Sequence, residues 1–237
     1  GHLQAAEVMV AVASNFTRTL ERLVPEFERK SGHSVTLVSG ATGRHYAQIV
    51  NGAPYDLFLA ADAEVTARLA EEGRAVAGSR AVYAVGRLAL WSRTAGYVNA
   101  QGAVLADGDF RRLSIANPRL APYGEAAVEV LTALGQYERL SERLVQGENI
   151  AQTYQFVDSG NAELGFVAYS QVLENGAGGS YWLVPEDLHA PLMQELILLK
   201  DGAAAREFVA FLLLPSTLAV IAANGYGVPE AAAVATP

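Results

Sequence analysis

Four short segments of the chain combine small polar or glycine residues with the predicted start of a helix. They are Ser14-Asn15, Ala41-Thr42-Gly43, Pro122-Tyr123-Gly124 and Asn149-Ile150-Ala151. A helix start offers backbone N–H groups without intrahelical partners and a partial positive charge of about half a unit. Several such starts that converge on one point would bind an anion without any lysine or arginine. These segments therefore favour anion binding.

Three of these residues also have a purely structural interpretation. Ser14, Asn15 and Thr42 carry side chains that commonly cap helix N-termini, so each could serve only its own helix. Arg44 and His45, just after Thr42, could contact an anion. They also fit solvated residues in the first turn of a helix, which is the interpretation we favour.

Catalytic alternatives have less support in the sequence. The chain has four histidines, His2, His33, His45 and His189. Their spacing matches neither HxH nor HExxH, so a histidine metal site is not expected. Asp56 and Asp62 flank a predicted strand and could be paired carboxylates for acid–base catalysis. The simpler interpretation is that Asp62 caps the following helix and that Asp56 faces solvent or a loop amide.

Composition and charge limit the classes of function. The 237 residues carry a net charge of −8, include no cysteine and are 51% hydrophobic, which is typical of a globular chain with one large domain or two smaller ones. The negative charge argues against nucleic acid, which favours basic patches. It does not exclude an anion, because the Debye length of about 8 Å screens surface carboxylates from a buried site. No apolar run reaches the roughly 18 residues of a membrane span.

Strand and helix patterns alternate along the chain, which predicts α/β architecture with parallel strands and right-handed crossovers. The predicted strands and extended segments span residues 7–13, 34–39, 55–60, 81–91, 113–117, 163–168 and 192–199. The predicted helices span residues 16–30, 44–50, 63–72, 124–134, 151–158, 170–175, 203–213 and 216–224. In such sheets ligands collect beyond the carboxyl ends of the strands, where the four polar segments lie.

Six segments together resemble the periplasmic molybdate-binding proteins of ABC importers. They are Ala11–Phe16, Ser39–Gln48, Gly52–Asp62, Ala116–Gly124, Glu163–Ala168 and Ala223–Val228. They follow the order of that family from about Glu7 to Val228. The combination of GAPYDLFLAAD with a later NPRLAPYG is specific.

The resemblance implies an α/β, two-lobe periplasmic binding protein fold of type II, with parallel-rich sheets flanked by helices and the ligand in the inter-lobe cleft. Lobe I would comprise residues 7–83 and 195–230, and lobe II residues 84–194. Hinge strands are expected near Ala81–Val85 and Glu195–Leu198. Residues 1–6 would be a tag or signal remnant, and residues 231–237 a flexible tail.

The resemblance also implies ligand residues. In the first lobe, Ser14 and Asn15 match the positions of a ligand hydroxyl and amide, and Thr42 lies where the family usually has serine. In the second lobe, Tyr123 matches a residue that donates its backbone N–H, and Ile150 matches an aliphatic residue, commonly valine, that does the same.

One position departs from the family pattern. Some members use a tyrosine hydroxyl directly after the strand that corresponds to Glu163–Ala168. Here that position is Ala168, and Tyr169 follows one residue later. The hydroxyl of Tyr123 is therefore a candidate to replace this contact.

The function implied is that of the substrate-binding protein of a molybdate ABC transporter, not an enzyme. It would bind molybdate or tungstate through neutral donors and close by a hinge motion, without a cofactor and with no metal beyond the oxyanion. It would be a periplasmic monomer that delivers its ligand to a membrane permease and does not bind nucleic acid. The alternatives are a receptor of the same fold for sulfate, an organic acid or a chelated metal, and an enzyme that uses Asp56 and Asp62.

Overall fold

The computed structural model describes residues 4–229, which fold into two compact units. Unit 1 contains the described chain up to Val85, Met193–Ala223 and the residues from Gly227 onward, and unit 2 contains Gly86–Leu192 with Asn224–Tyr226. Residues 1–3 of the expected remnant and the expected tail, 231–237, lie outside the described residues.

Unit 1 is built on a five-stranded sheet with the order β2-β1-β3-β10-β4. Its strands are β1 (Glu7–Ala13), β2 (Ser34–Gly40), β3 (Leu57–Leu59), β4 (Ala81–Gly86) and β10 (Leu192–Leu198). Strand β1 pairs in parallel with β2 and β3, as the alternation of strands and helices predicts. Strand β10 pairs antiparallel with β3. The chain enters β10 from unit 2 and not from a helix that follows another strand of this sheet. The rule that strand–helix–strand units give parallel strands therefore does not apply to β10.

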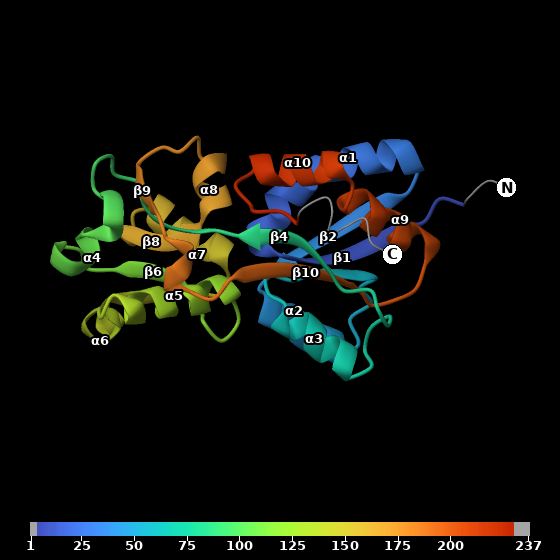
Figure 1. The fold of residues 1–237 in the computed structure, drawn as a ribbon, viewed down its shortest axis with the longest axis horizontal. Helices are drawn as coiled ribbons and strands as arrows, with labels where there is room; N and C mark the ends of the chain where they lie inside the picture. Colours follow the sequence, from blue (N-terminus) through green and yellow to red (C-terminus); the bar gives the residue numbers. More distant parts are fainter. Residues whose placement is uncertain (1–3, 230–237) are drawn as a thin grey trace. The chain divides into compact units, whose positions relative to one another are not determined.

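Helices cover both faces of this sheet, with α2 and α3 on one face and α1, α9 and α10 on the other (Figure 1). Their bounds are α1 (Thr17–Ser31), α2 (Thr42–Val50), α3 (Glu64–Glu71), α9 (Ala203–Leu212) and α10 (Pro215–Ala223). Helix α2 begins at Thr42, two residues before the predicted start. Pro215 occupies the first position of α10, where its missing N–H costs no hydrogen bond.

Helix α1 shows how the sequence determines these elements. The side chains of Leu20, Leu23, Val24 and Phe27 recur at helical spacing and are all buried. Gly32 ends the helix in the left-handed conformation, with φ of 76°, and its N–H donates to the Glu28 carbonyl at 2.9 Å.

Unit 2 contains a second five-stranded sheet with the order β7-β6-β8-β5-β9. Its strands are β5 (Leu88–Ser92), β6 (Leu113–Ala116), β7 (Leu144–Gly147), β8 (Leu164–Ala168) and β9 (Ser180–Leu183). Strand β6 is parallel to β7 and β8, whereas β5 is antiparallel to β8 and β9. The predicted extended segment 81–91 divides near Arg87 into β4 and β5, which belong to different sheets. The sequence did not predict β7 or β9, because these short edge strands are only partly buried and carry no continuous apolar run.

The helices of unit 2 lie on both faces of its sheet, with α5 on one face and α8 on the other (Figure 1). Their bounds are α4 (Val104–Asp107), α5 (Pro122–Ala133), α6 (Tyr137–Leu140), α7 (Ile150–Asp158) and α8 (Tyr169–Glu174). Short 3-10 helices occur at Ser14–Phe16 (η1), Ala100–Gly102, Ser141–Arg143 and Glu186–Leu188.

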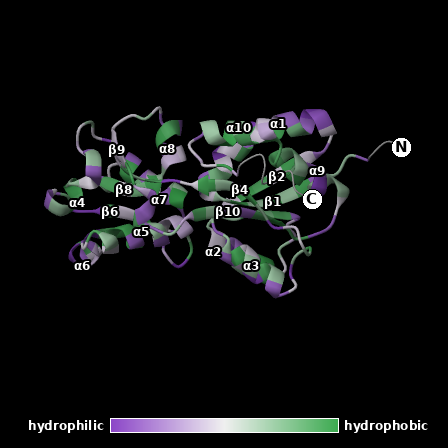
Figure 2. Cartoon of the chain, viewed as in Figure 1, coloured by the Kyte–Doolittle hydropathy of each residue, from purple (hydrophilic) through white to green (hydrophobic). Residues whose placement is uncertain are grey.

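Hydrophobic residues concentrate on the strands and the inward faces of the helices within each unit (Figure 2). The α/β class predicted from the sequence, with sheets flanked by helices, is confirmed. Within residues 4–229, no individual helix has the length and apolar character of a membrane span. The pair α9 and α10, bent by 59° at the break between them, meets these criteria only when both are counted together.

Candidate anion-binding site

The first two polar segments lie at the carboxyl ends of adjacent parallel strands in unit 1. The register of β1 and β2 pairs Ala13 with Gly40, the last residues of the two strands. Ser14 and Ala41 therefore leave the sheet side by side, since paired strands are about 4.8 Å apart. The 3-10 helix η1 and helix α2 begin at this edge, so the backbone N–H groups of two helix starts lie close together.

Thr42 bonds the segment that follows β3 instead of capping its own helix. Its Oγ1 accepts a hydrogen bond from the Ala61 N–H at 3.0 Å, and the residue is only 3% exposed. The N-cap residue of α2 is Ala41, which has no side-chain cap. The capping interpretation of Thr42 is therefore wrong. An oxygen that accepts from Ala61 directs its own O–H elsewhere, so this hydroxyl can donate to a ligand.

Asn15 is also tied to a distant part of the unit. Its Nδ2 donates to Oε1 of Gln194 on β10 at 2.9 Å, and Asn15 is 3% exposed. Ser14 and Asn15 lie within η1, and neither is the N-cap residue of η1 or α1, which are Ala13 and Phe16. The capping interpretation is thus wrong for these two residues as well.

His45 is buried, contrary to the expectation of a solvated first-turn residue. It is 1% exposed, and its Nε2 lies 3.1 Å from the Val12 carbonyl oxygen. A carbonyl can only accept, so Nε2 carries a proton and joins α2 to the end of β1. Burial lowers the pKa of His45 below its ordinary value. Arg44 is exposed, as expected.

The lowered pKa of His45 predicts a loss of stability in mild acid. The unfolded chain binds the His45 proton near pH 6.5, whereas the folded chain binds it only at lower pH, so the free energy of unfolding should fall as the pH drops below about 6.5. The slope from one such proton is at most about 1.4 kcal/mol per pH unit. Urea unfolding of the native protein and of His45→Gln, which cannot titrate, at several pH values between 5 and 8 measures the difference. Equal slopes for the two proteins would contradict the prediction.

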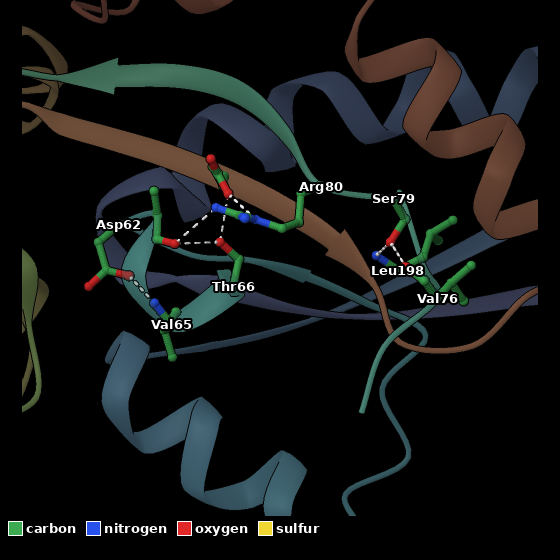
Figure 3. Close-up of polar contacts among 9 residues, drawn as sticks. Asp62, Val65, Thr66, Val76, Ser79, Arg80 and Leu198 are labelled. Atoms are coloured by element: carbon green, nitrogen blue, oxygen red, sulfur yellow. Dashed lines mark hydrogen bonds and ion pairs between the residues drawn. The ribbon is translucent and has the colours of Figure 1, made fainter. Parts of the chain in front are cut away.

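Asp56 and Asp62 each accept a hydrogen bond from a backbone N–H group. Asp56 Oδ2 accepts from the Met9 N–H at 2.8 Å, and Asp62 Oδ1 accepts from the Val65 N–H at 3.1 Å at the start of α3 (Figure 3). Asp62 bonds the first turn of α3 as expected, although the N-cap residue of that helix is Ala63 and not Asp62. Asp56 binds an amide of strand β1 and not the expected solvent or loop amide. Burial raises the pKa of Asp62, and the nearby negative charges of Glu64 and Glu195 add to the effect.

Glu195 has partners of its own near the start of α3. Its Oε1 accepts from Arg80 Nε at 2.8 Å and from Thr66 Oγ1 at 2.7 Å (Figure 3). Thr66 also donates toward the Ala63 carbonyl. These contacts join β10, the entry to β4 and α3. Glu195 is thus ion-paired with Arg80 beside the start of α3.

In unit 2 the same arrangement recurs with different residues. Strands β6 and β7 are parallel and pair Ala116 with Gly147 at their carboxyl ends. Helix α5 begins at Pro122 and helix α7 at Ile150, so both helices start beyond this edge. Asn149 caps α7, because its side chain accepts from the Gln152 N–H at 2.9 Å.

The start of α5 lies directly against the end of β6. A Cβ atom built on Gly124 would lie 2.0 Å from the Ala116 carbonyl oxygen, so only glycine permits this approach. Tyr123, the second residue of the helix, is 2% exposed. The close packing at Gly124 fixes the position of the first turn of α5.

Gln171 joins two further elements at this edge. Its Oε1 accepts from the Ala168 N–H at 2.9 Å, and its Nε2 donates to the Ile150 carbonyl at 3.1 Å. The end of β8 is thereby held to the first residue of α7. Ile150 itself is 3% exposed.

Tyr169 packs within unit 2 beside Tyr181. It is the first residue of α8, its N–H donates to the Arg87 carbonyl at 2.8 Å, and its ring centroid lies 6.0 Å from that of Tyr181. Burial, with the adjacent Tyr181, raises the pKa of the Tyr169 hydroxyl. Ala168 offers no hydroxyl at the position where some family members have one.

Each unit therefore brings together its own share of the predicted site residues. Ser14, Asn15 and Thr42 gather at one edge of the first sheet, and Tyr123 and Ile150 lie at the starts of two helices at one edge of the second. All these groups are neutral donors. Among residues 4–229, no cluster of three histidine or acidic side chains is placed to hold a metal ion.

Two buried glutamines at these edges were missed in the sequence. Gln194 is 0% exposed and Gln171 is 8% exposed, and each bonds a segment that carries a candidate residue. The available signal for Gln194 was a polar residue inside the apolar segment 192–199. That signal does not identify the hydrogen-bond partner of Gln194, because Asn15 lies 179 positions away in the sequence.

Residues 8–227 match the family of bacterial extracellular solute-binding proteins. The molybdate-binding protein ModA of Azotobacter vinelandii is 53% identical over 229 residues, which cover 94% of this chain and 91% of the relative. ModA of Rhodobacter capsulatus is 48% identical over 225 residues, which cover 94% of this chain and 88% of the relative.

A solved structure agrees with these sequence relatives. The periplasmic molybdate-binding protein of Azotobacter vinelandii superposes with a TM-score of 0.91 at 41% identity, covering 94% of this chain and 100% of the other. The resemblance drawn from the six sequence segments is confirmed. These relatives are binding proteins and not enzymes, so the acid–base interpretation of Asp56 and Asp62 is not supported. The chain belongs to the bacterial extracellular solute-binding protein family.

Proposed function

We propose that this chain is the substrate-binding protein of a molybdate ABC transporter. The observation that carries the proposal is the 53% identity to a molybdate-binding protein over 94% of the chain. The two sheet edges support it, because each gathers helix starts and neutral donors of the kind that bind a dianion.

The proposed ligand groups come from both units. In unit 1 they are the hydroxyls of Ser14 and Thr42 with the adjacent amides, and Asn15. In unit 2 they are the backbone N–H groups of Tyr123 and Ile150. The bond from Ala61 to the Thr42 oxygen supports the role of that hydroxyl as a donor, and the bond from Gln171 to the Ile150 carbonyl supports a fixed Ile150 amide.

Selectivity over sulfate is proposed to follow from the fixed positions of these donors. The helix starts are anchored by bonds and close contacts such as that at Gly124, so they cannot follow a smaller ion inward. Each buried donor that a smaller ion leaves unpaired costs roughly 1–3 kcal/mol. Phosphate carries a proton at neutral pH, and its O–H donor would find no acceptor among ligand groups that are all donors. Phosphate should therefore bind more weakly than molybdate. Molybdate and tungstate both fit the proposal.

The cellular role follows from the same relatives. The chain is proposed to act in the periplasm, as a monomer, and to deliver its ligand to the membrane permease of the transporter without binding nucleic acid. The hinge closure and lobe boundaries implied by the resemblance remain predictions. A fall in the radius of gyration in solution scattering, on addition of molybdate, measures the closure.

Calorimetric titration tests the ligand. The purified protein is titrated separately with molybdate, tungstate, sulfate and phosphate at constant ionic strength. We expect submicromolar dissociation constants for molybdate and tungstate and binding of sulfate at least about tenfold weaker, as the loss of one donor predicts. Micromolar or weaker binding of molybdate, no tighter than that of sulfate, would overturn the proposal and favour a receptor for another anion.

The variant Asp62→Asn tests whether this carboxylate belongs to the site. Asparagine keeps an oxygen acceptor for the Val65 N–H, so molybdate affinity should stay within about twofold of the native value. The pKa of Asp62 is higher in the folded chain than in the unfolded chain, so the ionised carboxylate lowers the free energy of unfolding once the pH exceeds the pKa of the unfolded chain. Asp62→Asn removes this charge and should be slightly more stable than the native protein at pH 7. Titration and thermal unfolding measure the two effects, and a tenfold loss of affinity would place Asp62 in the site.

A further inference from the structure

A buried chain of hydrogen bonds leads from Asn15 to the end of β3. Asn15 Nδ2 donates to Gln194 Oε1 at 2.9 Å, Gln194 Nε2 donates to Tyr83 Oη at 2.9 Å, and Tyr83 Oη donates to the Ala60 carbonyl at 2.8 Å. Asn15 is 3% exposed, and Gln194 and Tyr83 are 0% exposed. We call these four residues the amide relay.

The carbonyl at its end fixes the direction of the whole relay. The Ala60 oxygen can only accept, so the Tyr83 hydroxyl gives its proton to Ala60 and accepts the bond from Gln194. Gln194 must therefore face Tyr83 with its NH₂ group, which turns the Gln194 oxygen toward Asn15. Asn15 must then present its own NH₂ group at that point. Reversal would leave the Tyr83 and Ala60 oxygens 2.8 Å apart without a proton between them.

We propose that Gln194 and Tyr83 are positioning residues for the anion. They hold the side-chain amide of Asn15 in one orientation, in which one N–H donates to Gln194 and the second N–H of the same nitrogen is the group proposed to donate to the anion. This inference rests on the proposed function, in which Asn15 is a ligand residue. This orientation favours an oxyanion, because the side-chain oxygen of Asn15 in the place of its nitrogen would repel the negatively charged ligand.

The relay also lies on the two strands that lead the chain out of unit 1 and back into it. Tyr83 is the third residue of β4, which ends at Gly86, and Gln194 is the third residue of β10, which begins at Leu192. These strands are neighbours in the sheet. The aromatic ring of Tyr83 packs on Phe16, the residue after Asn15, with ring centroids 4.7 Å apart. The relay and this ring contact hold η1 to β4 and β10.

A double-mutant cycle on the full chain tests the proposal. Gln194→Leu keeps a side chain of similar size and removes both relay bonds. Its effect on molybdate affinity is measured by calorimetry in the native background and in an Asn15→Ala background. We expect a loss of about tenfold or more in the first and of less than about twofold in the second, because Gln194 acts only through Asn15. Equal losses in the two backgrounds, or no loss in the native one, would overturn the proposal.

A control variant separates positioning from general stability. Thr217 is a buried residue of unit 1 whose Oγ1 donates to the Phe211 carbonyl at 2.7 Å, remote in sequence from the relay. Thr217→Val should lower the melting temperature and leave the molybdate affinity unchanged. If Thr217→Val lowers affinity as much as Gln194→Leu does at a similar loss of melting temperature, the relay has only a structural role.

Two further measurements keep the test decisive. Tyr83→Phe removes one hydroxyl and should lower affinity only while Asn15 is present, so it replaces Gln194→Leu in the cycle if that variant does not fold. Titration of the native protein comes first. A native protein that does not bind molybdate more tightly than sulfate overturns the proposed function and this inference with it. If the native protein binds molybdate tightly but the losses of affinity from Gln194→Leu and Asn15→Ala are additive, only the amide relay is overturned.

Discussion

Replacing Thr42 with valine is expected to lower the affinity for molybdate by roughly 10- to 100-fold. Valine has nearly the shape of threonine but lacks the hydroxyl that is proposed to donate to the anion, and a hydrogen bond to a charged group contributes about 1.5–3 kcal/mol. The same change leaves the buried N–H of Ala61 without its acceptor. The melting temperature should therefore also fall by roughly 2–8 °C.

Thr42→Ser provides the matched control. Serine keeps the oxygen that accepts from Ala61 and the O–H that would donate to the anion, so its affinity should stay within a few-fold of the native value. Calorimetry and thermal unfolding of the three proteins separate the ligand contact from the loss of stability. If the valine variant binds molybdate as tightly as the serine variant, Thr42 is not a ligand residue.

Replacing Gly124 with alanine is expected to have a large effect on unit 2. The added Cβ would meet the Ala116 carbonyl oxygen at 2.0 Å and the Asn117 carbonyl carbon at 3.0 Å, both backbone atoms that cannot rotate aside. The first turn of α5 must shift, and the N–H of Tyr123 shifts with it. We expect a loss of stability of about 1–3 kcal/mol or more and a loss of molybdate affinity of about tenfold or more.

Gly178→Ala is the control for this substitution. Gly178 lies in the same unit, and a Cβ there would meet Asn175 no closer than 3.5 Å, which is ordinary contact. This variant should keep both its melting temperature and its affinity, measured by calorimetry and thermal unfolding. Native affinity in Gly124→Ala would show that the position of the α5 start does not matter for the ligand.

Local chemistry located the polar edges correctly, because each depends on residues that are neighbours in sequence. The alternation of strands and helices predicted parallel pairing of β1, β2 and β3, and parallel strands place their carboxyl ends at one edge. The start of α2 was misplaced by two residues, since the hydroxyl of Thr42 suits a turn as well as a first helical position. Helix ends depend on weak preferences and are the least determined part of such patterns.

The partners of the polar side chains could not be predicted. His45 and Arg44 are adjacent and both polar, yet His45 is buried against Val12 and Arg44 is exposed. A sequence pattern gives the face of a helix only approximately, and the neighbouring strand end decides which side chain is covered. The short edge strands β7 and β9 were missed for a related reason, since partial burial leaves no apolar run.

The sequence by itself determined the α/β class, the four polar segments and the family, because each of these is a local pattern or an ordered set of local patterns. Tertiary structure alone decided that Thr42 accepts from Ala61 and that Asn15 bonds to Gln194 across 179 positions. A hydroxyl or an amide can cap its own helix or bond a distant strand at similar energy. The choice depends on which strand ends meet in the folded sheet, and for Asn15 on a strand that joins the sheet near the end of the chain.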